Sequence, residues 1–120
     1  MDALLDTTVV IHLLRRYQSA LSWFNTTQVY GITAITWLEV MEGTTGKAHQ
    51  TQSKSILAQF EMQYLGAADQ QWAMEQFEQF QFSHHIGMND CLIASVAHRL
   101  GLPLYTHNLK DMTPMIGELA

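Results

Sequence analysis

Four acidic side chains spread along this chain of 120 residues have the type and spacing that hydrolytic chemistry requires, namely Asp6, Glu39, Asp90 and Asp111. Carboxylates gathered at one place repel each other, which raises their pKa values or demands a cation. Mg²⁺ and Mn²⁺ suit such a place because they are hard ions that prefer oxygen ligands. A metal of this kind can activate water and stabilise charge on a phosphoryl oxygen, so the acids indicate hydrolysis of a phosphodiester.

The first acid, Asp6, lies between two apolar segments of different kinds. Residues 3–5 are too few for a helix and predict a short buried strand, whereas Val9, Val10 and Leu13 recur at helical spacing. Asp6 therefore follows the carboxyl end of a strand, which is where open parallel sheets place their ligand crevices. The alternative is that Asp6 only caps the helix, since Asp is a favoured N-cap residue and such caps are common.

The second acid, Glu39, also lies near a junction between a strand and a helix. Residues 29–35 are rich in strand-forming side chains, and the tetrad Thr36-Trp37-Leu38-Glu39 follows them. The tetrad matches a capping box, with Thr36 at the N-cap and Glu39 three residues on. The pattern predicts a helix that runs to about Gly43.

Further alternation of helices and strands follows along the chain. The spacing predicts helices over 49–60 and 69–82, a short helix over 19–24 and a strand over 63–65. Asn89 is the predicted N-cap of a helix that begins with Asp90 and ends at Gly101. Residues 102–106 predict a last strand, and polar residues that include Thr106 and Asn108 lie at its end. Residues 112–120 predict a turn of helix or a frayed edge.

This alternation predicts a single α/β domain over residues 1–120, with a short parallel central sheet flanked by helices and joined by right-handed crossovers. The carboxyl ends of parallel strands meet at one edge, so Asp6, Glu39 and Asp111 are expected along one rim. Asp90, at the start of a helix, is expected to face the same crevice. The rim is therefore the predicted metal site.

Composition limits the alternatives. Hydrophobic residues make up 48% of the chain and charged residues 14%, which argues against disorder. No apolar run is long enough to span a bilayer and no cleavage signal is visible, so we expect a soluble cytoplasmic protein with no membrane partner. The lone Cys91 fits a reducing compartment and a small core side chain. The paired His84 and His85 have no further His or Cys at ligand spacing.

The net charge of −5 has the wrong sign for a protein that grips nucleic acid through an extended basic face. A carboxylate cluster that holds a divalent cation is locally much less negative than this count implies. Arg15 and Arg16 form the densest positive patch, but they also lie at the end of the first helix, where cations suit the helix dipole. The charge therefore weakens a nucleic-acid function without excluding it.

Three segments, LLDTTVVIHLL, ITAITWLEVMEG and IGMNDCLIASVAHRLGLPLYTHNLKDM, resemble the successive motifs of PIN-domain proteins. The compact length resembles the VapC-type ribonuclease toxins of bacterial toxin–antitoxin pairs. The resemblance implies a three-layer-type PIN-like fold and endonucleolytic cleavage of RNA, with Mg²⁺ bound by Asp6, Glu39 and Asp90. It makes Asp111 the fourth acid, and the final strand common in the family is expected to be short or missing.

The same resemblance implies roles for three hydroxyl or amide side chains. Thr7 matches the hydroxyl that follows the first acid, and Thr106 and Asn108 match the polar pair of the last motif. It also implies a homodimer and a cognate antitoxin with a basic tail that covers the acidic site. The segment from Gln79 to Met88 carries fewer basic residues than is usual in the family.

Two other functions stay open. One is a PIN-like binding or scaffold module without activity, which an incomplete set of acids would favour. The other is a receiver-type phospho-acceptor domain, which needs adjacent acids after the first strand and a lysine after a late strand. Here Thr7 follows Asp6, and the late strand ends in Thr106 and His107. Fold-level analogy alone does not decide among these functions.

Overall fold

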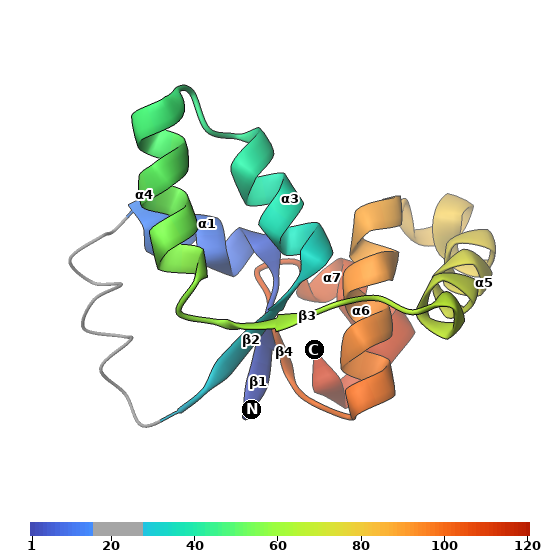
Figure 1. The fold of residues 1–120 in the computed structure, drawn as a ribbon. Helices are drawn as coiled ribbons and strands as arrows, with labels where there is room; N and C mark the ends of the chain where they lie inside the picture. Colours follow the sequence, from blue (N-terminus) through green and yellow to red (C-terminus); the bar gives the residue numbers. More distant parts are fainter. Residues whose placement is uncertain (16–27) are drawn as a thin grey trace.

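The computed structural model describes residues 1–15 and 28–120. Its centre is a parallel sheet of four strands in the order β3-β2-β1-β4 (Figure 1). The strands are β1 (Ala3–Leu5), β2 (Tyr30–Thr33), β3 (Glu61–Gln63) and β4 (Leu104–Tyr105). The predicted α/β fold with a short parallel central sheet is confirmed. Arg16 and the predicted helix over residues 19–24 lie outside the described residues.

Helices flank the sheet in two groups (Figure 1). The first group comprises α1 (Thr7–Arg15), α3 (Ala34–Glu42) and α4 (Lys47–Leu57). The second comprises α5 (Ala67–His84), α6 (Met88–Leu100) and α7 (Leu109–Ile116), followed by a 3₁₀ turn over Gly117–Leu119. Within the described residues, no helix has both the length and the apolar character needed to cross a bilayer.

Strand β1 is buried on both of its faces, which explains its continuous apolar sequence. Successive side chains of a strand point to opposite faces. Ala3 and Leu5 accordingly join the buried cluster that includes Val10, Val40 and Leu57 of the first helix group. Leu4 joins the other cluster, whose members come mainly from α6 and α7. The two clusters hold β1 in one register, so Asp6 follows at a defined height.

The start of α3 corrects the predicted capping box. The helix begins at Ala34, and its N-cap is Thr33, whose Oγ1 accepts a hydrogen bond from the Thr36 N–H at 3.2 Å. Thr36 lies within the first turn and is fully buried, so the prediction that Thr36 is the N-cap was wrong. Strand β2 pairs with β3 only as far as Thr33, and the strand-forming character of Ala34 and Ile35 does not extend it.

Two other boundaries differ from the predictions, whereas the helical turn expected at the carboxyl terminus is present. The third strand is Glu61–Gln63 rather than 63–65, because this polar edge strand follows its pairing with β2 and not its apolar content. Helix α6 begins at Met88 with Gly87 as N-cap and no side-chain capping bond, so Asn89 is not the cap. The carboxyl-terminal residues form α7 and the 3₁₀ turn, and no strand follows β4 up to Ala120.

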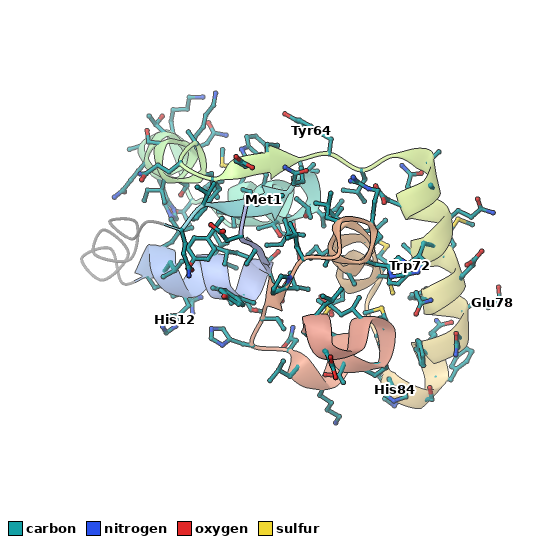
Figure 2. The ribbon with its side chains drawn as sticks, turned by 90° about the horizontal axis from the view of Figure 1, so that it is seen from below. Met1, His12, Tyr64, Trp72, Glu78 and His84 are labelled. Carbon is teal, nitrogen blue, oxygen red and sulfur yellow. The ribbon has the colours of Figure 1, made fainter. Side chains whose placement is uncertain are left out.

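The remaining helix boundaries were nearly right. Gly101 ends α6 with a φ of 63°, a conformation that glycine adopts at no steric cost. Helix α5 is tied to α6 because the buried Asp69 accepts a hydrogen bond from Arg99 Nε at 2.9 Å. Trp72 of α5 also stacks on His98 of α6, with ring centroids 4.7 Å apart (Figure 2). These contacts fasten the last turn of α6 to the first half of α5.

Candidate active site

Asp6 lies directly beyond β1 and its side chain is only 1% exposed. Its carboxylate accepts three hydrogen bonds. Oδ1 accepts from the Thr7 N–H at 2.8 Å, and Oδ2 accepts from the hydroxyls of Thr8 at 3.0 Å and Thr106 at 2.7 Å. The Asp6 carbonyl also accepts from the Val10 N–H, the first bond of the α1 ladder. Asp6 therefore caps α1 and also lies in a polar cluster.

The loop after β4 is fastened to this cluster. The Thr106 hydroxyl accepts from the Asn108 N–H at 2.8 Å, and the Thr8 hydroxyl accepts from the His107 N–H at 3.2 Å. Since each hydroxyl accepts from a backbone donor, its own proton is directed to Asp6. Strand β4 lies next to β1 in the sheet, which is why residues separated by a hundred positions meet here.

Thr7 links the first acid to the second. Its Oγ1 lies 2.7 Å from Glu39 Oε1 and 3.0 Å from Thr36 Oγ1. Glu39 projects from the second turn of α3 and is half-buried. Because the Thr7 hydroxyl has a single proton, the Glu39 carboxylate is the natural acceptor and the Thr36 hydroxyl can donate to Thr7. The expected neighbourhood of Thr7 and Glu39 is thus present, although Glu39 does not serve a helix cap.

The pKa of Asp90 depends on its burial and on the charges around it. Burial raises its pKa from 3.8 to about 6, with further contributions from the negative charges of Asp6, Asp111 and Glu39, in that order. Asp90 lies in the first turn of α6 and Asp111 in the first turn of α7. The structure therefore brings the four acids into one electrostatic neighbourhood. Burial first, and then repulsion from these like charges, explain why Asp90 keeps its proton to a higher pH than usual.

The donor set fits a hard divalent cation in its chemistry. All four side chains offer carboxylate oxygens, and the charges of the other three contribute, after burial, to the raised pKa of Asp90. Over residues 1–15 and 28–120, however, no three Asp, Glu, His or Cys side chains lie close enough together to hold an ion directly. Mg²⁺ usually keeps several waters and binds through one or two carboxylates, so water can bridge the remaining acids.

A cleft of about 250 Å³ opens beside Thr7 and Glu39, between α1, α3 and the start of α6. Leu38, Glu42 and Asn89 also line it, and none of these three was predicted as a site residue. Glu42 lies one helical turn beyond Glu39, which was a usable signal in the sequence. The contribution of Asn89 follows only from the packing of α6 against α3.

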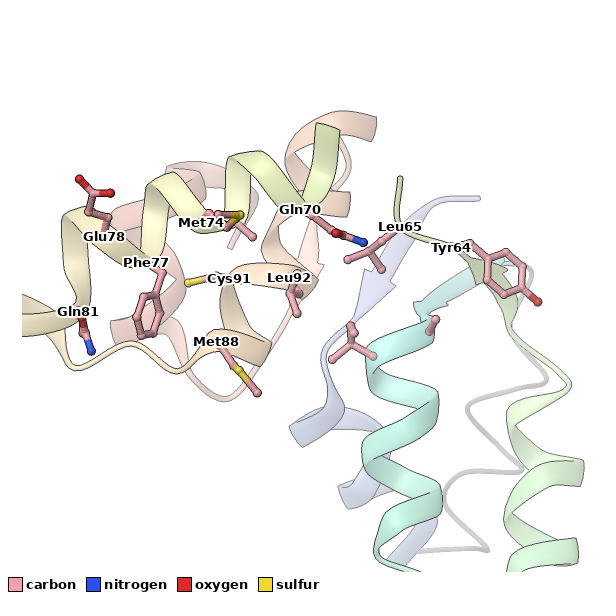
Figure 3. A pocket seen from close by; sticks show the side chains of 13 residues that line it. Tyr64, Leu65, Gln70, Met74, Phe77, Glu78, Gln81, Met88, Cys91 and Leu92 are labelled. Atoms are coloured by element: carbon pink, nitrogen blue, oxygen red, sulfur yellow. The ribbon is translucent and has the colours of Figure 1, made fainter. Parts of the chain in front are cut away.

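A larger groove of about 890 Å³ lies away from the acids, between α5, α6 and the start of α3 (Figure 3). Its lining is mainly apolar and includes Met74, Phe77, Met88 and Leu92, with none of the four acids. Cys91 also faces it, and burial together with the charge of Asp90 raises the pKa of that thiol to about 11. The thiol is therefore neutral at pH 7, as expected for a core side chain.

The sequence also missed Thr8 as a member of the polar cluster. Its position two residues after Asp6 was the available signal, because a hydroxyl in the first turn of a helix can reach back to the residue before it. His107 and His12 lie beside each other at the edge of the cluster, with ring centroids 5.5 Å apart. Figure 2 shows His12 projecting from the outer side of α1.

Comparison with known families decides what kind of domain this is. The family model of the PIN domain matches residues 3–110. The chain belongs to the PIN-domain family. A search of curated protein sequences finds no match. Membership excludes the receiver-type phospho-acceptor domain, and the predicted PIN-like fold is confirmed.

Solved structures with a PIN-like fold resemble this PIN domain over nearly its whole length. A toxin-antitoxin complex from Klebsiella pneumoniae is 26% identical, with a TM-score of 0.69, and the match covers 97% of this chain and 94% of that chain. VapBC2 from Rickettsia felis, bound to a DNA fragment from its promoter, is 23% identical with a TM-score of 0.75, covering 98% and 95%. VapBC-1 from nontypeable Haemophilus influenzae is 24% identical with a TM-score of 0.68, covering 94% and 91%.

Proposed function

We propose that this PIN domain is a VapC-type toxin that cleaves RNA endonucleolytically in the presence of Mg²⁺, or of Mn²⁺ in its place. The observation that carries the proposal is the neighbourhood of four carboxylates, in which the charges of Asp6, Asp111 and Glu39 add to burial in raising the pKa of Asp90. The likeness to a toxin-antitoxin complex from Klebsiella pneumoniae supports the biological role. The net charge of −5 suits a site where a cation compensates the acids.

The proposed roles of the site residues rest on the hydrogen bonds of Asp6, Thr7, Glu39 and Thr106 and on the charges around Asp90. Asp6, Asp90, Glu39 and Asp111 would hold the metal, directly or through water. The Thr7 hydroxyl, 2.7 Å from Glu39 Oε1, orients that carboxylate, and the Thr106 hydroxyl does the same for Asp6 at 2.7 Å. Asn108 orients Thr106 through its backbone N–H. When bound, the metal would supply an activated water and stabilise charge on the phosphoryl oxygen.

The test is cleavage of structured and unstructured RNA by purified protein with Mg²⁺, with and without EDTA. We expect cleavage to stop on chelation and to return when Mg²⁺ or Mn²⁺ is restored. Asp6→Asn and Asp90→Asn should each abolish cleavage while circular dichroism shows a folded protein. Glu75→Gln, which changes an exposed acid of α5, is the matched control and should cleave normally.

Cleavage that survives chelation would refute the metal-dependent mechanism. A folded wild-type protein that cleaves no RNA under any of these conditions would favour the inactive PIN-like binding module instead.

We also propose an antitoxin with a basic, partly disordered tail as the partner at the acids. Arginine forms bidentate hydrogen bonds with carboxylates, and the four acids offer several acceptors at one rim. A small DNA-binding protein encoded immediately upstream would be the candidate to co-express. Its tail should inhibit cleavage, and removing the arginines of the tail should relieve that inhibition. Inhibition that persists without those arginines would contradict this assignment.

The apolar groove of Figure 3 suits a second copy of this chain rather than a basic tail, because Glu78 is the one charged residue among the described residues that line it. Met74 and Met88 in this groove are 71% and 68% exposed. Met74→Lys should therefore convert a homodimer into a monomer in light scattering coupled to size exclusion. Leu109→Lys, on exposed α7 surface outside the groove, is the control. A wild-type monomer would refute the homodimer.

A further inference from the structure

We propose that the cleft between α1 and α3 binds the nucleobase next to the scissile phosphate, and that Glu42 selects bases that carry an exocyclic amino group. This inference rests on the proposed ribonuclease function and adds a determinant of its sequence preference. The residues that line the cleft come from α1, α3 and α6, and they are Thr7, Ile11, Ile35, Leu38, Glu39, Glu42 and Asn89.

The position of the cleft is the first argument. Thr7 and Glu39, joined at 2.7 Å, belong both to the acidic site and to the lining of the cleft. Ile11 lies one turn beyond Thr7 on α1, and Glu42 lies about one turn beyond Glu39 on α3. The cleft thus extends outward from the acids between these two helices. A phosphate held at the acids is one ribose away from each neighbouring base, so one of these bases can reach the cleft.

The walls of the cleft suit a flat heterocycle. The cleft has apolar walls formed by Ile11, Ile35 and Leu38. Leu38 is 57% exposed, so its side chain is accessible to a ligand. Single-stranded RNA is recognised through bases that are splayed out, packed on side chains and hydrogen-bonded along their edges. A volume of about 250 Å³ is below the range of pockets for drug-sized ligands and is suited to one ring system.

Charge decides which part of the nucleotide enters. Glu39 and Glu42 both line the cleft, and no Lys or Arg is found among its described lining residues. A phosphate would be repelled by these two carboxylates, so the RNA backbone stays outside and the base enters. Carboxylate side chains accept hydrogen bonds from base amino groups, and the Asn89 amide can both donate and accept. The chemistry therefore favours a base over a phosphate.

The same chemistry ranks the bases. Adenine, cytosine and guanine each carry an exocyclic amino group that can donate to Glu42. Uracil has no amino group, and its one ring donor, N3–H, lies between two carbonyl oxygens that would approach the carboxylate with like partial charge. Glu42 is exposed, so water can also hydrate its carboxylate, and the difference between the bases rests on this repulsion rather than on a lost hydrogen bond. We therefore expect uracil to be the poorest base at this position.

The test measures binding without catalysis. Wild-type protein in Ca²⁺, a hard cation that also takes oxygen ligands, is titrated into fluorescently labelled oligo(A), oligo(C) and oligo(U) of one length, and the Kd values are read from anisotropy. Oligo(U) should bind about tenfold more weakly than the other two, the discrimination typical of one good side chain–base pair. Because this measurement needs no cleavage, it can succeed or fail independently of the proposed nuclease activity.

Three variants sharpen the result. Glu42→Gln gives the side chain a donor and should bring the ratio of the Kd values close to one. Glu75→Gln, an exposed acid on α5, should leave the ratio unchanged. Leu38→Ala removes apolar wall and should weaken all three oligonucleotides alike. Equal affinities in the wild type, an unchanged ratio in Glu42→Gln, or no RNA binding at all would overturn the assignment.

Discussion

Replacement of Asp90 by Asn should stabilise the metal-free protein at neutral pH. Burial and the charges of Asp6, Asp111 and Glu39 raise the pKa of Asp90 from 3.8 to about 6, so its ionised form is unfavourable in the folded state. At about 1.4 kcal/mol for each pH unit, this rise corresponds to about 3 kcal/mol. Asp90 is partly exposed, and solvent screening reduces the expected effect to about 1–2 kcal/mol.

The dependence on pH has a defined sign. The folded protein holds the Asp90 proton more tightly than the unfolded chain does, so this group's contribution to stability is fully present below pH 3.8 and is lost as the pH rises through about 6. Protonated Asp and Asn are similar in size and are both neutral. The two proteins should therefore have nearly equal stability at pH 4 and differ most at pH 7.5.

Urea unfolding in EDTA at these two pH values measures the effect, with Glu75→Gln as the control. Saturating Mg²⁺ should reverse the order at pH 7.5, because a ligand that binds only the folded state stabilises it and Asp90→Asn binds the metal less well. An Asp90→Asn protein that is less stable than wild type in EDTA at pH 7.5 would refute the reasoning. So would an equal gain in stability at pH 4 and pH 7.5.

Three further substitutions separate structural from chemical roles. Thr33→Ala removes the N-cap of α3 and should cost about 0.5–2 kcal/mol in urea unfolding. Glu39→Gln keeps an acceptor for the Thr7 hydroxyl and should leave metal-free stability unchanged or slightly raised, while metal-dependent cleavage falls by a large factor; normal cleavage would remove Glu39 from the site. Asp6→Asn should lower the free energy of unfolding in urea by about 1–3 kcal/mol, because the new amide group faces two hydroxyls that now donate to a carboxylate and would have to reorient. Relief of the repulsion among the acids would offset part of this loss.

The order of the elements could be predicted because the apolar residues of most strands and helices recur at the spacing typical of that element. Residues 3–5 are buried on both faces and apolar throughout, and Gly101 marks the end of α6. The start of α3 could not be read correctly, because Thr33 and Thr36 are both plausible N-caps. The choice between them depends on where β2 stops pairing with β3, which is a property of the sheet. The same holds for β3, whose exposed edge position permits a polar sequence.

Some features of the site could likewise be predicted from the sequence, and others could not. The four acids could be found from the sequence, since each lies near the junction of two elements of different periodicity. The high pKa of Asp90 could not, because it depends on how the fold brings α6 and α7 close to Asp6, and the cleft beside Glu39 could not, because it depends on how α6 packs against α3. Thr8 and the backbone N–H of His107 meet only because β4 lies beside β1. Distances across the sheet are not encoded in local spacing.

The two interpretations of Asp6, helix cap and catalytic acid, are compatible because its two oxygens have different partners. Oδ1 accepts from the Thr7 N–H at the start of α1, whereas Oδ2 accepts from the hydroxyls of Thr8 and Thr106. The cap fixes the direction of the carboxylate, and the hydroxyls compensate its charge in a place that is almost closed to water. A buried carboxylate fixed in this way needs little reorganisation to act, which is the property that electrostatic catalysis requires. Capping is thus the means by which β1 and α1 present this acid to the other three.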